Sequence, residues 1–495
     1  MFASSQPFLL YDYLRVPYTV DAALVQSARC PTPVARWGRI VASNAATGPC
    51  LSWPLFREGQ LSPAGALEPR RLRLRDVVLH GRVMPDETLR PVLDGSSQRW
   101  TAVEAVHMDG GRCASVWRSS TGDIVLPFDP DEVITGYWTE RYVDLAAATA
   151  ASRLRSGLKT TYYAMRPLLP RSVQIALRRA YSHVQRRTVF PRWPVDLSLH
   201  RLYDLLLTWS AAVADAEVPR LALWPAGHRW ALVLTHDVET ASGLANLPVL
   251  RDIEQRLGYR SSWNFVPGRY RVDQSLVQRL WDEGFEVGLH GLRHDGRDLD
   301  PRQLPRRLPQ MRRYADAWGA VGFRAPATQR DWNTMSQLPF RYDSSYPDSD
   351  PFEPQPGGCC SWLPFINGEV VELPITLPQD HTLFVILRAR DGRPWLDKAE
   401  QIKSVGGMAL LLTHPDYVVH PPLTAAYEQV LSHFADDPDV WRALPAAVAD
   451  WWRRRAASSL VRNGAGWRVV GPAADEASVD LTDPPTCAAR ESRVE

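Results

Sequence analysis

The stretch ALVLTHDVE, from Ala231 to Glu239, decides how the rest of the chain is interpreted. Its four apolar residues lead into Thr235, His236 and Asp237. A short apolar run that ends in polar residues predicts a buried parallel strand. In parallel α/β folds the loops that follow the strands meet at one edge, and the chemistry lies there. We therefore expect Asp237 and Glu239 to lie at the edge of a sheet.

Strand-like and helix-like segments alternate from this stretch to about residue 452. The apolar runs RSSWNFV, EVGLHG and MALLLTHPDY predict strands, and the segments between such runs predict helices. Strands that alternate with helices indicate βαβ units and a mostly parallel sheet. The number of segments favours an incomplete or distorted (β/α) barrel over a plain open sheet.

The rest of the chain differs from this pattern. Residues 1–150 contain short strand-like segments between Gly, Pro and Asp turns, which predict a smaller mixed α/β accessory domain. Residues 151–220 predict a basic helical linker that leads into the barrel at 221–455. Residues 456–495 become polar and acidic after one strand-like run, which predicts a C-terminal extension that is largely disordered.

A helix predicted at about 166–187 within this linker has an apolar stripe surrounded by arginines. The stripe consists of Val173, Leu177, Ala180, Tyr181 and Val184. Such a helix could make peripheral contact with an anionic membrane surface. It could also pack its apolar side on the neighbouring domain and leave its basic side in water, which is the interpretation that we favour.

The composition of the chain bears on which partners it binds and in which compartment it is found. The formal net charge of +2 gives no global field that would favour nucleic acid. The six cysteines fit neither a zinc knuckle nor a disulfide framework, so we expect reduced thiols. The sequence shows neither a convincing signal peptide nor an apolar run of roughly 20 residues. We therefore expect a soluble protein of the cytoplasm.

Polar or ionisable side chains follow five of the predicted strands. These residues are Asp237 and Glu239, His290 and His294, Arg324, Asp343, and His414. Two histidines separated by three residues can ligate one metal ion if the backbone curls between them. With a carboxylate from another strand they form a set that leaves positions open for water and substrate. Such a set is typical of a catalytic metal site, although Arg324 and His414 could also have structural roles alone.

The order of these motifs resembles that of the polysaccharide deacetylase, or NodB-homology, family (carbohydrate esterase family 4). The family motifs TFDDG, H(S/T)xxH and RxP correspond to THDVE at 235–239, HGLRH at 290–294 and RAP at 324–326. The last family motif, a strand that ends in histidine, corresponds to LLLTH at 410–414. The resemblance covers about residues 231–417, which is less than half of the chain.

The resemblance implies a distorted (β/α) barrel, a divalent metal that is usually zinc, and hydrolysis of an N- or O-linked acetyl group on a sugar. By position in the motifs, Asp237 corresponds to the catalytic base and His414 to the general acid. His290 and His294 correspond to metal ligands, and Arg324 corresponds to the residue that orients the base. The implied substrate is an acetylated glycan of the cell surface or its precursor.

The sequence departs from the family pattern at several positions. Val238 stands where the family has its metal-binding aspartate, so we place the carboxylate ligand at Glu239. Gly291 stands where a hydroxyl residue is usual, which we expect to weaken the ordering of the loop. The fourth motif is matched only loosely, and we assign its supporting acid to Asp343.

Three functions are therefore open. A metal-dependent deacetylase of a glycan is the function that we favour. An amidohydrolase that acts on a non-sugar C–N bond would use the same fold and the same groups. A catalytically degenerate protein that binds or assembles glycans is the third, and Val238 and Gly291 are the features that favour it.

Overall fold

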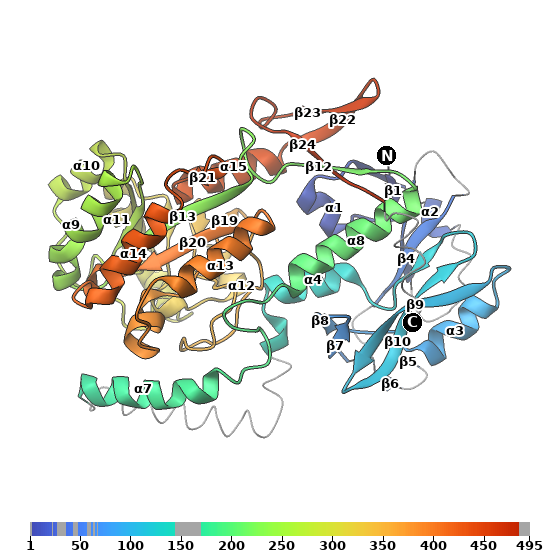
Figure 1. Cartoon of the computed structure of the whole chain (residues 1–495), viewed down its shortest axis with the longest axis horizontal. Coiled ribbons are helices and arrows are strands. Elements are labelled where there is room, and N and C mark those ends of the chain that lie inside the picture. Colours follow the sequence, from blue (N-terminus) through green and yellow to red (C-terminus); the bar gives the residue numbers. More distant parts are fainter. Residues whose placement is uncertain are drawn as a thin grey trace. The chain divides into compact units, whose positions relative to one another are not determined.

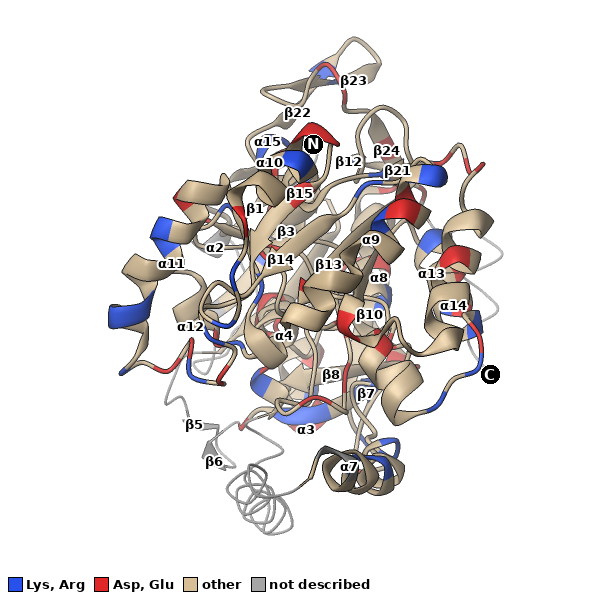
Figure 2. Ribbon diagram, turned by 90° about the vertical axis from the view of Figure 1, so that its left-hand side faces the viewer, with Lys and Arg blue, Asp and Glu red and all other residues tan. Residues whose placement is uncertain are grey.

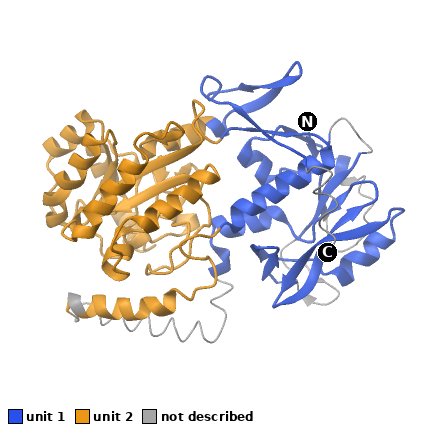
Figure 3. Ribbon diagram, in the orientation of Figure 1, with its two compact units in different colours: residues 1–148, 197–222, 455–495 blue, residues 149–196, 223–454 orange. Residues whose placement is uncertain are grey.

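The structure is a computed structural model, and its contacts divide the chain into two compact units (Figure 3). Unit 1 comprises residues 1–148, 197–222 and 455–495, and unit 2 comprises 149–196 and 223–454. The structure describes residues 2–21, 23–26, 36–42, 48–56, 61–62, 65–66, 68–143 and 170–484.

Unit 1 contains a mixed sheet whose described strands follow the order β2-β1-β3-β4-β11-β10-β9-β7-β8. The pairs β1–β2 and β4–β11 are parallel, and the other neighbours are antiparallel. The strands are β1 (Phe2–Ser4), β2 (Tyr18–Val20), β3 (Arg36–Ala42), β4 (Cys50–Leu55), β7 (Arg70–Leu74), β8 (Val77–Gly81), β9 (Trp100–Met108), β10 (Gly111–Ser119) and β11 (Ile124–Val125). Further elements of this unit are α1 (Leu9–Leu14), α2 (Ala23–Gln26), β5 (Leu61–Ser62), β6 (Gly65–Ala66), α3 (Asp86–Asp94), α4 (Pro130–Trp138) and α8 (Ser198–Ala214).

The C-terminal segment of the chain forms strands that belong to unit 1. These strands are β22 (Ser459–Asn463), β23 (Gly466–Val470) and β24 (Val479–Thr482). The strand β22 is antiparallel to β23, and β24 is antiparallel to β12 (Val218–Leu221), which precedes unit 2 in the sequence. Buried Leu460 and Val469 pack against Leu221, and the buried Arg455 guanidinium donates to the carbonyls of Ala222 and Leu221. The prediction of a largely disordered extension is therefore wrong up to residue 484, since these contacts join distant segments; residues 485–495 lie outside the described part.

The predicted division of the chain also differs from the observed one at the linker. The segment predicted at 151–220 is shared between the units, because α8 and β12 belong to unit 1 whereas α7 (Arg171–Gln185) belongs to unit 2. Residues 151–169 of the predicted linker lie outside the described residues. No helix in the described part of the chain is long and apolar enough to cross a membrane.

Unit 2 is an α/β fold around a mostly parallel sheet in the order β18-β19-β17-β16-β15-β14-β13-β20, with β21 also paired to β13 (Figure 1). Only the pair β18–β19 is antiparallel among these described strands. The strands are β13 (Trp230–Val238), β14 (Ser262–Phe265), β15 (Glu286–Leu289), β16 (Gly322–Phe323), β17 (Tyr342–Asp343), β18 (Phe365–Asn367), β19 (Val370–Glu372), β20 (Met408–Thr413) and β21 (Val440–Arg442). The longer helices are α9 (Ala241–Arg256), α10 (Gln274–Asp282), α11 (Leu304–Trp318), α13 (Arg393–Ser404), α14 (Pro421–His433) and α15 (Pro445–Ala456), and the short ones are η2 (Pro326–Thr328), α12 (Trp332–Met335), η3 (His381–Ile386) and η4 (Pro415–Tyr417).

The strand β13 is the predicted buried strand, and all nine of its residues are buried. It lies between β14 and β20, which run parallel to it. The chain then turns directly into α9, because the Thr240 side chain accepts a hydrogen bond from the Gly243 amide and so caps the helix. The end of β13 is thereby fixed on both sides.

The sheet curls so that the segment after β19 reaches β20. The Thr376 hydroxyl donates to the carbonyl of Met408 and accepts from the amide of Leu410, both at 2.7 Å. The amide of Leu377 donates to the carbonyl of Leu410 at 3.1 Å. The strand ends of this sheet therefore point toward a shared space.

Candidate active site

The C-terminal ends of the parallel strands bring six of the seven predicted side chains together. Contacts of 4.0 Å or less connect Glu239 to both His294 and His414. Contacts of 3.7 Å or less connect Asp237 to both His290 and Arg324. The two sets meet where ligand atoms of Glu239 and His290 lie within 4.8 Å of each other. The residues come from the ends of β13, β15, β16 and β20, as the strand-end argument predicted. Asp343 has a different environment, described below.

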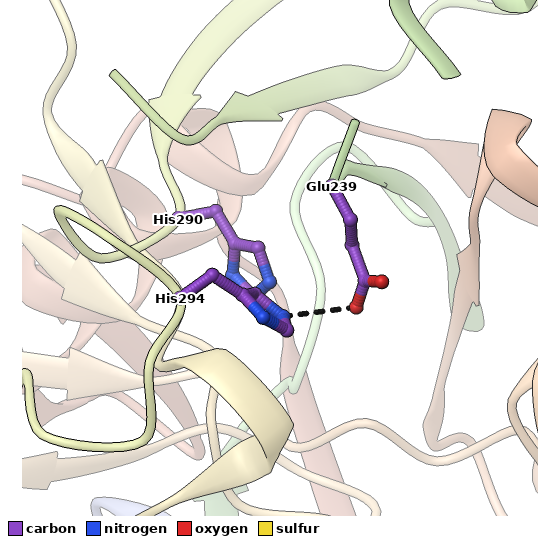
Figure 4. A group of neighbouring side chains, drawn as sticks. All are labelled: Glu239, His290 and His294. Carbon is purple, nitrogen blue, oxygen red and sulfur yellow. Dashed lines mark ion pairs between the residues drawn. The ribbon is translucent and has the colours of Figure 1, made fainter. Parts of the chain in front are cut away.

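Glu239, His290 and His294 form a group whose ligand atoms all lie within 4.8 Å of one another (Figure 4). His294 Nε2 lies 2.9 Å from Glu239 Oε1. Yet the Nε2 atoms of both histidines are buried and have no partner with hydrogen-bond geometry in the described residues. Buried polar atoms without partners are rare and need an explanation. Three donor atoms that converge without satisfying one another fit a bound cation.

The protonation state of His290 suits a metal ligand. Burial, only partly opposed by Asp237, lowers the pKa of His290 to about 4, so the ring is neutral at neutral pH. Its Nδ1 lies 3.1 Å from the carbonyl oxygen of Arg324, to which a neutral ring can donate. That hydrogen bond leaves the lone pair on Nε2, which faces Glu239 and His294.

The loop that carries the two histidines is shaped by a carboxylate. Gly291 and His294 both have positive φ, at 62° and 53°, which curls the backbone between the two rings. The Asp298 carboxylate accepts from the amides of Leu292 and Arg293 at 3.0 and 3.4 Å. A Cβ on residue 291 would lie only 2.4 Å from Asp298 Oδ2. Asp298 thus orders the loop that we expected Gly291 to weaken, and it requires the glycine.

Hydrogen bonds to Asp416 and Tyr270 fix the backbone around Val238 and Glu239. The Glu239 amide donates to Asp416 Oδ2 at 2.9 Å, and the Thr240 hydroxyl also donates to the Asp416 carboxylate. The buried Val238 instead offers its carbonyl to the Tyr270 hydroxyl. Burial alone would raise the pKa of Glu239, but the neighbouring histidines outweigh burial and lower it well below its usual range. Glu239 is therefore an ionised carboxylate at neutral pH.

Asp237 is a buried carboxylate that its neighbours keep ionised. Asn264 Nδ2 donates to Asp237 Oδ1 at 2.9 Å, while Oδ2 lies 3.5 Å from Arg324 Nη1 and 3.7 Å from His290 Nδ1. Burial raises the pKa of Asp237, but His290 and Arg324 outweigh it, so the pKa is lowered. An ionised carboxylate beside the ligand group can accept a proton from a water molecule.

Arg324 is fixed in a buried position behind Asp237. Its Nη2 donates to Thr235 Oγ1 at 3.1 Å and to Ser344 Oγ at 2.9 Å, and the side chain is 1% exposed. A guanidinium has a rigid planar set of donors, so these two bonds determine where Nη1 lies. Nη1 of Arg324 is thereby kept 3.5 Å from Asp237 Oδ2, as an ion pair without hydrogen-bond geometry.

His414 adjoins the ligand group at Glu239, whereas Asp237 adjoins it at His290. Its Nδ1 lies 2.7 Å from Asp380 Oδ1, and its backbone amide donates to Asp380 Oδ2 at 2.6 Å. Its Nε2 lies 4.0 Å from Glu239 Oε1. Burial lowers the pKa of His414, but Asp380, with Glu239 and Asp237, outweighs burial and raises the pKa to about 10. The imidazolium can therefore donate a proton from Nε2.

The carboxylate that contacts His414 is Asp380, and the assignment of a supporting acid to Asp343 stays a prediction. Asp343 instead accepts from the Ser345 hydroxyl at 2.7 Å, and Ser345 in turn accepts from the amide of Ala325. Burial raises the pKa of Asp343. Asp343 thus supports the backbone next to Arg324.

The sequence did contain a signal for Asp380. It lies three residues after EVVELPITL (369–377), a run with the composition of a strand, so the strand-end criterion used for the other residues would have included it.

No family model and no curated protein matches the chain, but solved structures do. A probable polysaccharide deacetylase from Pseudomonas aeruginosa PAO1 shares 17% identity, with coverage of 53% of this chain and 98% of that one, at a TM-score of 0.40. The Puue allantoinase shares 14% sequence identity, and the match covers 47% of this chain and 93% of the allantoinase at a TM-score of 0.38. The peptidoglycan deacetylase PdaC from Bacillus subtilis shares 14%, with coverage of 46% and 94%, at 0.32.

Proposed function

We propose that unit 2 is a metal-dependent hydrolase that removes an N- or O-linked acetyl group from a sugar of a cell-surface polysaccharide or its precursor. The observation that carries this proposal is the convergence of Glu239, His290 and His294 between a carboxylate, Asp237, and an imidazolium, His414. We also propose that the curled sheet is a distorted barrel of the NodB-homology type, which the hydrogen bonds between the segment after β19 and β20 support.

The proposed metal ligands are Glu239, His290 and His294. Two imidazoles and one carboxylate suit zinc or a similar divalent ion and leave positions open for water and substrate. A cation bound there would lower the pKa of a water molecule and polarise the acetyl carbonyl.

The neighbouring side chains supply the proton transfers. Asp237 accepts a proton from the water that attacks the carbonyl carbon, and Arg324 holds the carboxylate in the orientation to do so. His414 donates a proton to the departing amine or alkoxide, because an unprotonated amine anion is a very poor leaving group. Asp380 keeps the His414 ring protonated and fixes its direction.

We do not favour the alternative of a degenerate glycan-binding protein. That alternative rested on Val238 and Gly291. Glu239 supplies the carboxylate that Val238 cannot, and Asp298 orders the loop around Gly291. An amidohydrolase on a non-sugar C–N bond would need the same groups, so the choice of substrate must be tested directly.

The test combines metal content with release of acetate. The purified full chain, supplied with zinc, is expected to retain about one divalent ion per chain and to release acetate from N-acetylglucosamine oligomers or O-acetylated sugars. Glu400→Gln, which removes a surface contact with His433, is a control that should not alter turnover. Hydrolysis of non-sugar amides without any activity on acetylated sugars would replace this function by the amidohydrolase. Failure to retain a metal would overturn both.

A location in the cytoplasm also remains a proposal, supported by the pattern of cysteines. In the described residues Cys50 and Cys113 are free thiols. Thiols of this kind are usual in reducing compartments.

A further inference from the structure

The apolar stripe of α7 (Arg171–Gln185) faces water. Val173, Leu177, Tyr181 and Val184 are 40%, 46%, 50% and 48% exposed, respectively. At 3.6 residues per turn these four positions lie within about 80° of one another around the helix axis. The prediction that this side packs on the neighbouring domain is therefore wrong.

The polar side of the helix makes the contacts with the rest of unit 2. Arg179 donates through Nε and Nη2 to the carbonyl of Val385 at 3.0 and 2.8 Å, and Arg178 donates to the carbonyl of Phe352 at 3.3 Å. Gln185 donates to a further carbonyl at 2.7 Å. Backbone carbonyls of unit 2 need hydrogen-bond donors, and guanidinium groups on the polar side of α7 can supply them. The orientation of the stripe is therefore fixed by specific contacts.

The segment that contains α7 is strongly basic. Residues 145–195 contain ten Lys or Arg and no Asp or Glu. The whole chain carries only +2, so the remaining residues are net negative. Arg186 and Arg187, just beyond the helix, are exposed, and Figure 2 marks basic residues on α7 at its lower edge. Two exposed arginines thus directly follow the helix that carries the exposed apolar stripe.

We propose that α7 binds the surface of an anionic lipid bilayer, with its apolar stripe in the headgroup region. An amphipathic helix with apolar residues on one side and arginines beside them is the usual form of such a contact. A soluble polyanion would be attracted by the arginines but would leave the stripe in water. An apolar protein surface would cover the stripe but would gain little from the arginines. An anionic membrane surface is complementary to both the arginines and the stripe, and this inference does not depend on the proposed enzymatic function.

The binding test uses sedimentation of the full chain with sucrose-loaded vesicles. Vesicles of phosphatidylcholine with about 30% phosphatidylglycerol should bind the protein, and vesicles of phosphatidylcholine alone should bind it far more weakly. Binding should also weaken as the salt concentration rises from about 0.1 to about 0.5 M. If the full chain fails to bind the anionic vesicles, or binds both kinds equally, the proposal is overturned.

Two variants separate the roles of the stripe and the arginines. Leu177→Glu/Tyr181→Glu should reduce vesicle affinity at least about thirtyfold, because it places two carboxylates in the apolar stripe. Arg186→Gln/Arg187→Gln should reduce affinity by up to about thirtyfold, since each cation near the surface contributes about a factor of five.

The matched control is Val405→Glu, since Val405 is 41% exposed in the same unit but outside α7. It should bind vesicles like the wild type. Circular dichroism verifies that each variant is folded. If the stripe variant binds vesicles like the wild type, α7 is not the membrane contact. If the wild type does not bind vesicles, and light scattering shows a dimeric wild type but a monomeric stripe variant, the stripe is instead an interface between copies of the chain.

Discussion

Removal of the Asp380 carboxylate should make catalysis fail at alkaline pH first. Asp380 is the largest influence that raises the pKa of His414, and it opposes a burial that lowers it. In Asp380→Asn we expect the pKa to fall from about 10 toward its ordinary value of about 6.5. The general acid must be protonated to act, so a lower pKa removes the active form as the pH rises.

The expected loss of kcat/KM at alkaline pH follows from the pKa of His414 in the wild type and in Asp380→Asn. At pH 8.5 the wild-type His414 is almost fully protonated, whereas in Asp380→Asn only about one ring in a hundred is. At pH 5.5 most rings are protonated in both proteins. The ratio of wild-type to variant kcat/KM should therefore rise by about a hundredfold between these two pH values, on top of any pH-independent loss.

The assay measures kcat/KM for acetate release from an N-acetylated sugar between about pH 5 and 10, with metal content checked at each end. The ring ¹⁵N shifts of His414 report its protonation independently of turnover. Glu400→Gln is the matched control, because it also breaks a carboxylate–histidine contact of 2.8 Å but on the surface. Parallel profiles for the wild type and Asp380→Asn, with an unchanged His414 titration, would refute the role given to Asp380.

Three further changes test other parts of the site. His290→Ala or His294→Ala should abolish stoichiometric binding of a divalent ion, measured by elemental analysis, because two ligands cannot replace three. Asp237→Asn should keep the metal but lower turnover at least about a hundredfold, because the shape is kept and the base is lost. Gly291→Ala should lower the free energy of unfolding by about 1–3 kcal/mol, since the added Cβ collides with the Asp298 carboxylate. Thermal melting should show this loss, and the affinity for metal should fall as well. Gly227→Ala, also at positive φ but with no atom within 4 Å of the added Cβ, should cost less.

Each of these predictions has a contrary result. Full metal occupancy in both histidine variants would mean that the ligands are elsewhere. Near-normal turnover of Asp237→Asn would show that another group removes the proton. Equal losses for Gly291→Ala and Gly227→Ala would attribute the cost to backbone strain alone, with no special role for the contact with Asp298.

The sequence determined the parts of the site that depend on local pattern. The apolar run that forms β13 was readable because a strand buried on both faces must be continuously apolar. Since parallel strands end at one edge of a sheet, the order of residues along the chain was enough to group those that follow the strands. The positions of Asp237, His290 and His414 around Glu239 agree with that grouping.

Only the tertiary structure decided which groups touch across long separations. Asp380 contacts a histidine 34 residues later, and Arg455 at the end of α15 donates to the carbonyl of Leu221 in β12, 234 residues earlier in the chain. The sequence likewise showed that α7 is amphipathic but not which side is covered, since arginines can bind carbonyls as well as water. Periodicity fixes which residues share a side of an element. What that side meets is decided by where the rest of the chain places its carbonyls, carboxylates and apolar side chains.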